Sequence, residues 1–171
     1  MKNNFIQNEI WTLTFSAAFQ RANIYKGNPS ESEKRALKNK LRGLIEHVYL
    51  EQYEKPVEDH QHIKNIYGLS DFSKSFDNIL NDGQLNFGVC QKILNLYLKY
   101  QWCLGHFPEP PHFPVDRRIQ EILSIHPVVS WTQMNDDKDY MTVINKVRDL
   151  VDKKESIASY ELQNFSRRNS I

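Results

Sequence analysis

The segment from Phe87 to Leu104 constrains the fold most, because it predicts one long helix that is apolar around most of its circumference. At about 100° per residue, nine apolar side chains spread over the helical wheel: Val89, Ile93, Leu94, Leu96, Tyr97, Leu98, Tyr100, Cys103 and Leu104. A helix with so wide an apolar arc belongs at the centre of a bundle. Gly105 follows, and glycine readily ends a helix.

One narrow polar arc interrupts this helix, formed by Gln91, Lys92, Asn95 and Lys99. The arc faces either solvent or a groove, and both interpretations are open at this point. Lys92 and Lys99 are two turns apart, so they point the same way, about 10 Å from each other along the axis.

The next segment, HFPEPPHFPV, is rich in proline and cannot be helical. It is expected to be stiff, extended and exposed on at least one side. A new helix then begins after Asp116, where Ile119, Ile122 and Leu123 have helical spacing. Aspartate is a strong N-cap because its carboxylate accepts hydrogen bonds from unpaired backbone N–H groups. Capping is therefore the simplest role for Asp116.

The same residues resemble a motif of the helix-hairpin-helix DNA glycosylase superfamily. The resemblance consists of Gly88-Val89-x-x-Lys92, a helix, and then Pro114-Val115-Asp116-x-x-Ile119. In that family a G-V-G-x-K-type hairpin leads into a helix, and an aspartate follows in a V-D-x-x-[IV] turn. The resemblance implies a DNA N-glycosylase/lyase, a hydrolase of DNA repair.

By this resemblance Lys92 is the amine nucleophile and Asp116 the catalytic carboxylate that supports departure of the damaged base. Lys99 lies closer to Asp116 along the sequence and is a second candidate for the reactive amine. The family's iron–sulfur subgroup carries four clustered cysteines. The chain has two cysteines in all, so no cofactor is expected.

The chemistry makes demands that can be stated from the residues. An amine that attacks a sugar carbon must be neutral, so burial or a neighbouring cation has to lower its pKa. For Lys92, the neighbouring cations that could lower its pKa are Lys99, Arg117 and Arg118. The target base must leave the duplex stack. The proline segment must also bring the Asp116 carboxylate within about 5–8 Å of one lysine amine.

A basic helix is predicted after Ser30, which forms a capping-box pattern with Glu33. Its apolar stripe is Leu37, Leu41, Leu44 and Val48. Lys34, Lys38 and Arg42 share another face, which either contacts phosphates or is simply solvated. With Lys99, Arg117 and Arg118 they complete the candidate DNA-binding residues. The chain has 22 basic and 21 acidic side chains, so its overall charge favours no partner.

The remaining pattern predicts an all-α protein, a single compact domain of about six to seven helices over residues 1–165 with a frayed tail at 166–171. The first helix is expected from near Phe5 to Tyr25. Shorter helices are expected at Ile63–Tyr67 and Asp71–Leu80, after the break at Pro56, and a closing helix at Tyr140–Val151.

Several classes of site are excluded or unsupported. No segment is apolar enough to span a membrane or convincing as a signal peptide, so a cytoplasmic, reducing location is expected. Cys90 and Cys103 lie too far apart on one helix to pair. Glu58, Asp59, His60 and His62 lack a second ligand pair at a recognised spacing, so no metal site is expected. His106 and His112 are expected at the surface.

Two functional classes remain. One is a DNA-acting, glycosylase-like protein that works through Lys92 and Asp116. The other is a non-catalytic helical module that holds a protein partner on the proline segment or the basic helix. The oligomeric state stays open.

Overall fold

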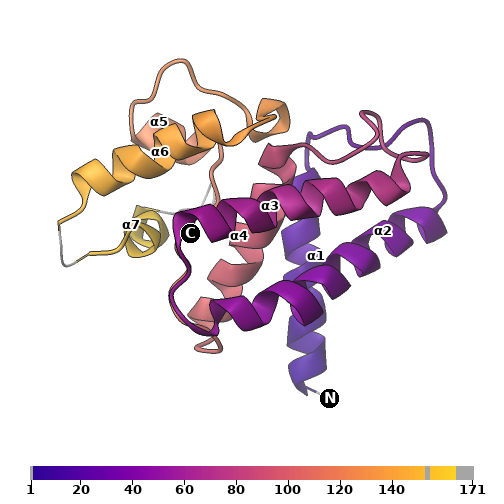
Figure 1. The fold of residues 1–171 in the computed structure, drawn as a ribbon, viewed down its shortest axis with the longest axis horizontal. Helices are drawn as coiled ribbons and strands as arrows, with labels where there is room; N and C mark the ends of the chain where they lie inside the picture. Colours follow the sequence, from indigo (N-terminus) through magenta and orange to yellow (C-terminus); the bar gives the residue numbers. More distant parts are fainter. Residues whose placement is uncertain (1, 153–154, 165–171) are drawn as a thin grey trace, which may run out of the picture.

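A computed structural model describes residues 2–152 and 155–164, and within them the chain is all-α, as expected (Figure 1). A single bridge, between Tyr25 and Leu80, is the only β pairing in these ranges. The predicted tail at 166–171 lies outside the described residues. Seven α-helices follow one another: α1 (Lys2–Phe19), α2 (Glu31–Leu44), α3 (Asp59–Ser73), α4 (Phe87–Cys103), α5 (Arg117–Ile122), α6 (Asp137–Leu150) and α7 (Ile157–Asn164).

Helix α4 is the centre of the molecule, as its wide apolar arc predicted. Every side chain from Phe87 to Lys99 is buried. Helices α1 and α3 pack against α4, and α5, α6 and α7 gather on its other side (Figure 1). Asn86 caps the helix by accepting a hydrogen bond from Val89 N, and Gly105 follows its end with a positive φ of 72°.

The polar arc of α4 does not face solvent. Gln91 bonds both backbone groups of Val115, at 2.8 and 3.1 Å. Asn95 donates to the hydroxyl of Tyr140 at 2.9 Å. The arc is therefore the surface onto which the proline segment and the last helices dock, and its polar groups are satisfied inside the protein.

Helix α2 begins as predicted, with both hydrogen bonds of the Ser30–Glu33 capping box formed. The predicted apolar stripe is wrong at its C-terminal end, because the helix continues into a π-helical turn, Ile45–Tyr49. The wider turn shifts the register. Ile45 and Tyr49 therefore enter the core, while Val48 is 53% exposed.

Two helix boundaries also differ from the prediction. Helix α1 ends at Phe19, and the chain turns through Arg21 with a φ of 64°. Helix α3 runs unbroken to Ser73, where two short helices were expected. Gly68 lies within α3, and a Cβ there would lie 2.3 Å from the hydroxyl of Tyr49, so glycine lets the two segments pack closely.

The proline segment is extended, with one exposed side, as expected. Pro108 and Glu109 are exposed, whereas Phe113, Pro114 and Val115 are buried. The closing helix is confirmed as α6, but α7 was not anticipated. No helix in the described residues has the length and apolarity needed to cross a membrane.

Candidate functional site

Asp116 lies at the N-terminus of α5 and uses its two carboxylate oxygens differently. Oδ1 accepts hydrogen bonds from Arg118 N at 2.9 Å and Ile119 N at 3.3 Å. Oδ2 lies 3.7 Å from Nζ of Lys92. Capping and lysine pairing therefore coexist, and the separation is shorter than the expected 5–8 Å.

The Lys92 side chain is enclosed, with 8% of its surface exposed. Its Nζ lies 3.6 Å from the centre of the Trp131 ring, in cation–π geometry. Burial lowers the pKa of Lys92, Asp116 opposes this effect, and the positive charge of Arg21 adds to it. The amine thus has the pKa direction that nucleophilic attack requires, and the cation that contributes is Arg21, which the sequence did not suggest.

Gly88 fixes the distance between α4 and Trp131. A Cβ at this position would lie 1.9 Å from the carbonyl oxygen of Trp131. Its N–H donates to Met134 O at 2.9 Å. Gly88 is therefore required for close packing inside a helix, and it forms no hairpin turn.

Lys99, the other candidate amine, is committed to a different carboxylate. Its Nζ lies 2.6 Å from Oε2 of Glu161 on α7, and both side chains are buried. Burial raises the pKa of Glu161, and the nearby Lys99 opposes that shift. Lys99 therefore joins α4 to α7, and of the two lysines Lys92 is the one paired with Asp116.

A pocket of about 340 Å³ opens beside Trp131. It is lined by Arg21, Arg117, Val128, Ser130, Trp131 and Gln133. Trp131 lines this pocket, and its ring also contacts the Lys92 amine. Arg117 was a sequence candidate, whereas Arg21 had no signal because it follows the unexpected end of α1. Arg118 lines a smaller cavity, which also includes Asp116 and Glu161.

The basic face of α2 is occupied by contacts within the N-terminal half. Lys34 pairs with Glu31 at 2.8 Å, and Lys38 lies 6.0 Å from the centre of the Phe19 ring. Arg42 bonds Glu46 at 3.0 Å and Asn8 at 2.8 Å. These contacts do not involve Lys92 or Asp116.

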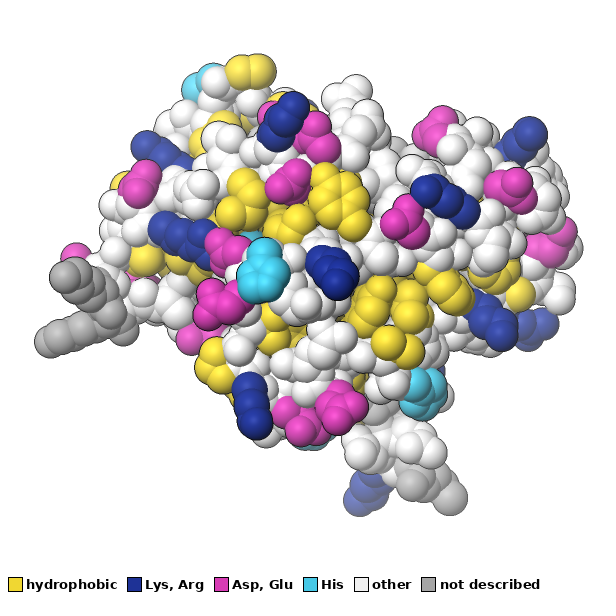
Figure 2. Space-filling view, viewed as in Figure 1, with side chains coloured by type: hydrophobic (Ala, Val, Ile, Leu, Met, Phe, Trp, Pro, Cys, Tyr) yellow, Lys and Arg dark blue, Asp and Glu magenta, His cyan; other side chains and the backbone are white. Residues whose placement is uncertain are grey.

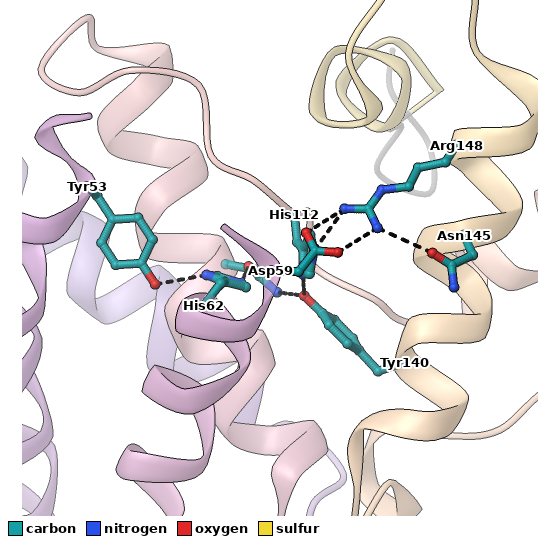
Figure 3. Close-up of polar contacts among 8 residues, drawn as sticks. Tyr53, Asp59, His62, His112, Tyr140, Asn145 and Arg148 are labelled. Carbon is teal, nitrogen blue, oxygen red and sulfur yellow. Dashed lines mark hydrogen bonds and ion pairs between the residues drawn. The ribbon is translucent and has the colours of Figure 1, made fainter. Parts of the chain in front are cut away.

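A second polar cluster, which the sequence did not reveal, crosses the core (Figure 3). His62 bonds Tyr53 at 2.8 Å and Asn95 at 2.9 Å. Asn95 continues to the hydroxyl of Tyr140, which bonds Nδ1 of His112 at 2.9 Å. We call these five residues the histidine network.

The network reaches the surface through an ion pair. Nε2 of His112 lies 3.0 Å from Oδ1 of Asp59, and Arg148 bonds the same carboxylate at 2.6 and 2.7 Å. Burial lowers the pKa of His112 to about 4 and that of His62 well below its usual value. The expectation that His112 lies at the surface is therefore wrong. Tyr140 is fully buried, so this network offers no group to a substrate.

No group of three or more His, Cys, Asp or Glu side chains in the described ranges is arranged to hold a metal ion. His62 in particular has both ring nitrogens engaged with Tyr53 and Asn95.

Comparisons of the chain with known protein families, with characterised proteins and with solved structures gave no match.

Proposed function

We propose that this protein acts on DNA as a glycosylase-like enzyme, with Lys92 as the nucleophilic amine and Asp116 as the carboxylate that faces the sugar. The observation that supports this proposal is the Lys92–Asp116 pair, 3.7 Å apart and beside a pocket lined by two arginines. The motif resemblance named the same two residues, although they lie on different helices and are separated by the whole proline segment.

In the proposed reaction the neutral amine attacks C1′ of the sugar and the glycosidic bond breaks. The base leaves with the bonding electron pair and takes one proton from the nitrogen. The C1′–O4′ bond then opens, and O4′ takes the second proton as the imine forms. Asp116 stabilises positive charge on the sugar through Oδ2, because Oδ1 is occupied by the cap. Burial favours the neutral amine.

Access to the amine requires movement. Trp131 covers Lys92, and its indole N–H donates to Ala18 O at 3.3 Å. In the proposal, DNA bound at the pocket displaces the Trp131 ring and exposes the amine to the extruded nucleotide. The intracellular, reducing location belongs to the same proposal.

Borohydride trapping tests the chemistry. Full-length protein is incubated with duplexes that contain uracil, 8-oxoguanine or an abasic site, and borohydride reduces any imine to a stable adduct. We expect an adduct in the wild type that Lys92→Met abolishes. Lys64→Ala removes an exposed lysine of α3 and should leave the adduct intact.

Abasic sites react with many amines, so an adduct on the duplexes that still contain a base decides whether the protein has glycosylase activity. Thermal unfolding of Lys92→Met establishes that the variant is folded. A wild type that forms no adduct and releases no base from a broad panel of modified duplexes would overturn the proposal, as would an adduct that survives in folded Lys92→Met.

The alternative, a protein-interaction module, has one specific observation in its favour. An apolar groove of about 650 Å³ lies between α2 and α3, where Leu44, Val48 and Phe72 contribute to its walls. Figure 2 shows hydrophobic side chains along this seam, with basic and acidic groups scattered around them. This class would be favoured if the protein neither released a base nor bound DNA, and if a protein partner shielded Val48 from solvent.

A further inference from the structure

The backbone N–H groups of residues 88–90, in the first turn of α4, are hydrogen-bonded within the protein. Gly88 N donates to Met134 O at 2.9 Å, and Val89 N donates to Oδ1 of Asn86 at 2.9 Å. Cys90 N donates to Asn86 O at 3.1 Å. These N–H groups cannot hold a phosphate, so a DNA strand next to Lys92 needs another ligand for its backbone.

Arg21 is placed for that role. It adopts a positive φ of 64°, which is unfavourable for a residue with a side chain and is found where the surrounding structure imposes it. Within the described residues its guanidinium forms no ion pair or hydrogen bond. Its charge instead faces the like charge of Lys92. An anion in the pocket would relieve this repulsion.

Arg117 approaches the same pocket from α5. Its Nε pairs with Glu121 at 2.6 Å, and Arg117 also lines the pocket. The lining contains two arginines and no acidic residue, and Ser130 and Gln133 add hydrogen-bonding groups. A guanidinium presents a planar fork of donors that matches phosphate oxygens.

We propose that Arg21 and Arg117 form a phosphate seat, which binds the DNA backbone phosphate adjacent to the sugar that Lys92 attacks. This inference rests on the proposed function and adds the group that positions the strand. The seat uses side chains of α5 and of the turn after α1, in place of helix N–H groups.

The seat is tested by binding, without chemistry. Fluorescence anisotropy measures the affinity of the full chain for a duplex that contains a tetrahydrofuran abasic analogue, at several salt concentrations. Arg21→Gly and Arg117→Ala should each weaken binding and reduce the slope of log K against log[salt] by about 0.9 per lost phosphate contact.

Two controls match these variants. Asn23 also has a positive φ, 42°, so Asn23→Gly relieves similar backbone strain without removing a pocket charge. Arg35→Ala removes an exposed arginine of α2. Both controls should keep the wild-type slope.

The outcomes separate the seat from the chemistry. If the slope of log K against log[salt] still depends on Arg21 and Arg117 in a Lys92→Met background, the seat is supported even if no adduct is ever trapped. If Lys92 is trapped on DNA but Arg21→Gly and Arg117→Ala bind DNA like the controls, the proposed function stands and the phosphate seat is overturned. A wild type without salt-dependent binding would also overturn it.

Discussion

Asp116 shows at the scale of one residue how one carboxylate can cap a helix and pair with a lysine amine at once. Its two oxygens divide between the cap of α5 and the Lys92 amine. The sequence indicated both roles, since Asp before a helical pattern predicts a cap and the motif predicts a catalytic carboxylate. It could not show that one side chain makes both the capping contacts and the contact with Lys92, because that depends on where the proline segment returns to α4.

Asp116→Asn separates these roles. Asparagine caps helices about as well as aspartate but carries no charge, so the cap should persist while Lys92 loses the group that opposes the fall in its pKa. We expect the pKa of Lys92, followed by NMR of its side-chain nitrogen, to fall further in this variant.

Asp116→Ala is the matched comparison. Both variants lack the carboxylate, but only asparagine can cap, so Asp116→Ala should be less stable than Asp116→Asn by about 1 kcal/mol in urea unfolding. Equal stability of the two would contradict the cap, and an unchanged Lys92 pKa in Asp116→Asn would contradict the pairing.

At the scale of elements, α4 organises the molecule through both of its faces. Its apolar arc packs against α1 and α3, and its polar arc bonds the proline segment, α6 and α7. Its first turn also sits directly on the backbone of Trp131, which positions the ring over Lys92. The approach of these two segments therefore sets the geometry of the site.

Gly88→Ala tests this approach. The added methyl would lie 1.9 Å from the Trp131 carbonyl oxygen, which is backbone and cannot move aside cheaply. We expect a loss of about 1–3 kcal/mol or more in the free energy of unfolding, because overpacking forces a backbone shift. Trp131 fluorescence should change as the ring leaves Lys92.

Gly43→Ala is the control within α2. The nearest atom to an added Cβ there is 4.0 Å away, on His47, so the methyl fits. Alanine should stabilise the helix by about 0.5–1 kcal/mol, since glycine is the poorer helix former. A Gly88→Ala variant that is as stable as Gly43→Ala would contradict the close contact.

At the scale of the whole molecule, local patterns predicted the helices better than the way they meet. Hydrophobic periodicity and the Ser30 cap identified α2, α4 and α6, because these signals are local. The π-helical turn at Ile45–Tyr49 and helix α7 had no comparable signal. Arg21 and the partner of Lys99 were missed for the same reason, since each depends on contacts between segments distant in sequence.

The histidine network is the clearest such case. His62, Asn95, His112 and Tyr140 come from four separate segments, and each is an ordinary polar residue in its own sequence context. Only the docking of the proline segment and α6 onto α4 makes them a continuous buried chain. The buried groups of the network are hydrogen-bonded to one another, which offsets the cost of taking them out of water.

This network should make the stability of the whole protein depend on pH. The partners of His112 require a neutral ring, in which Nε2–H donates to Asp59 and Nδ1 accepts from Tyr140. Its pKa is about 4 in the folded state against about 6.5 when unfolded. The unfolded state therefore binds more protons between these values, and stability falls as pH drops from about 6.5 to about 4.

The other charged groups at His112 do not produce this window. The hydrogen bond from Arg148 lowers the pKa of Asp59 from 3.8 to about 2, so this carboxylate contributes to the pH dependence mainly below pH 4. Arg148 stays charged throughout. His62 changes in the same direction as His112, because burial also lowers its pKa. The two histidines should thus act together.

Urea unfolding at pH 7, 5.5 and 4.5 measures the effect. We expect the wild type to lose stability on the order of 3 kcal/mol per histidine at most across the window, and less if the unfolded chain retains structure. His112→Gln should remove the part of the pH dependence that His112 contributes and leave the part from His62, although it lowers stability at pH 7 by breaking the network. His60→Gln removes an exposed histidine of α3 and should keep the wild-type profile. If His112→Gln and His60→Gln have the same pH dependence, then His112 does not stay neutral in the folded protein, and the docking of the proline segment onto α4 and α6 must differ from the one described.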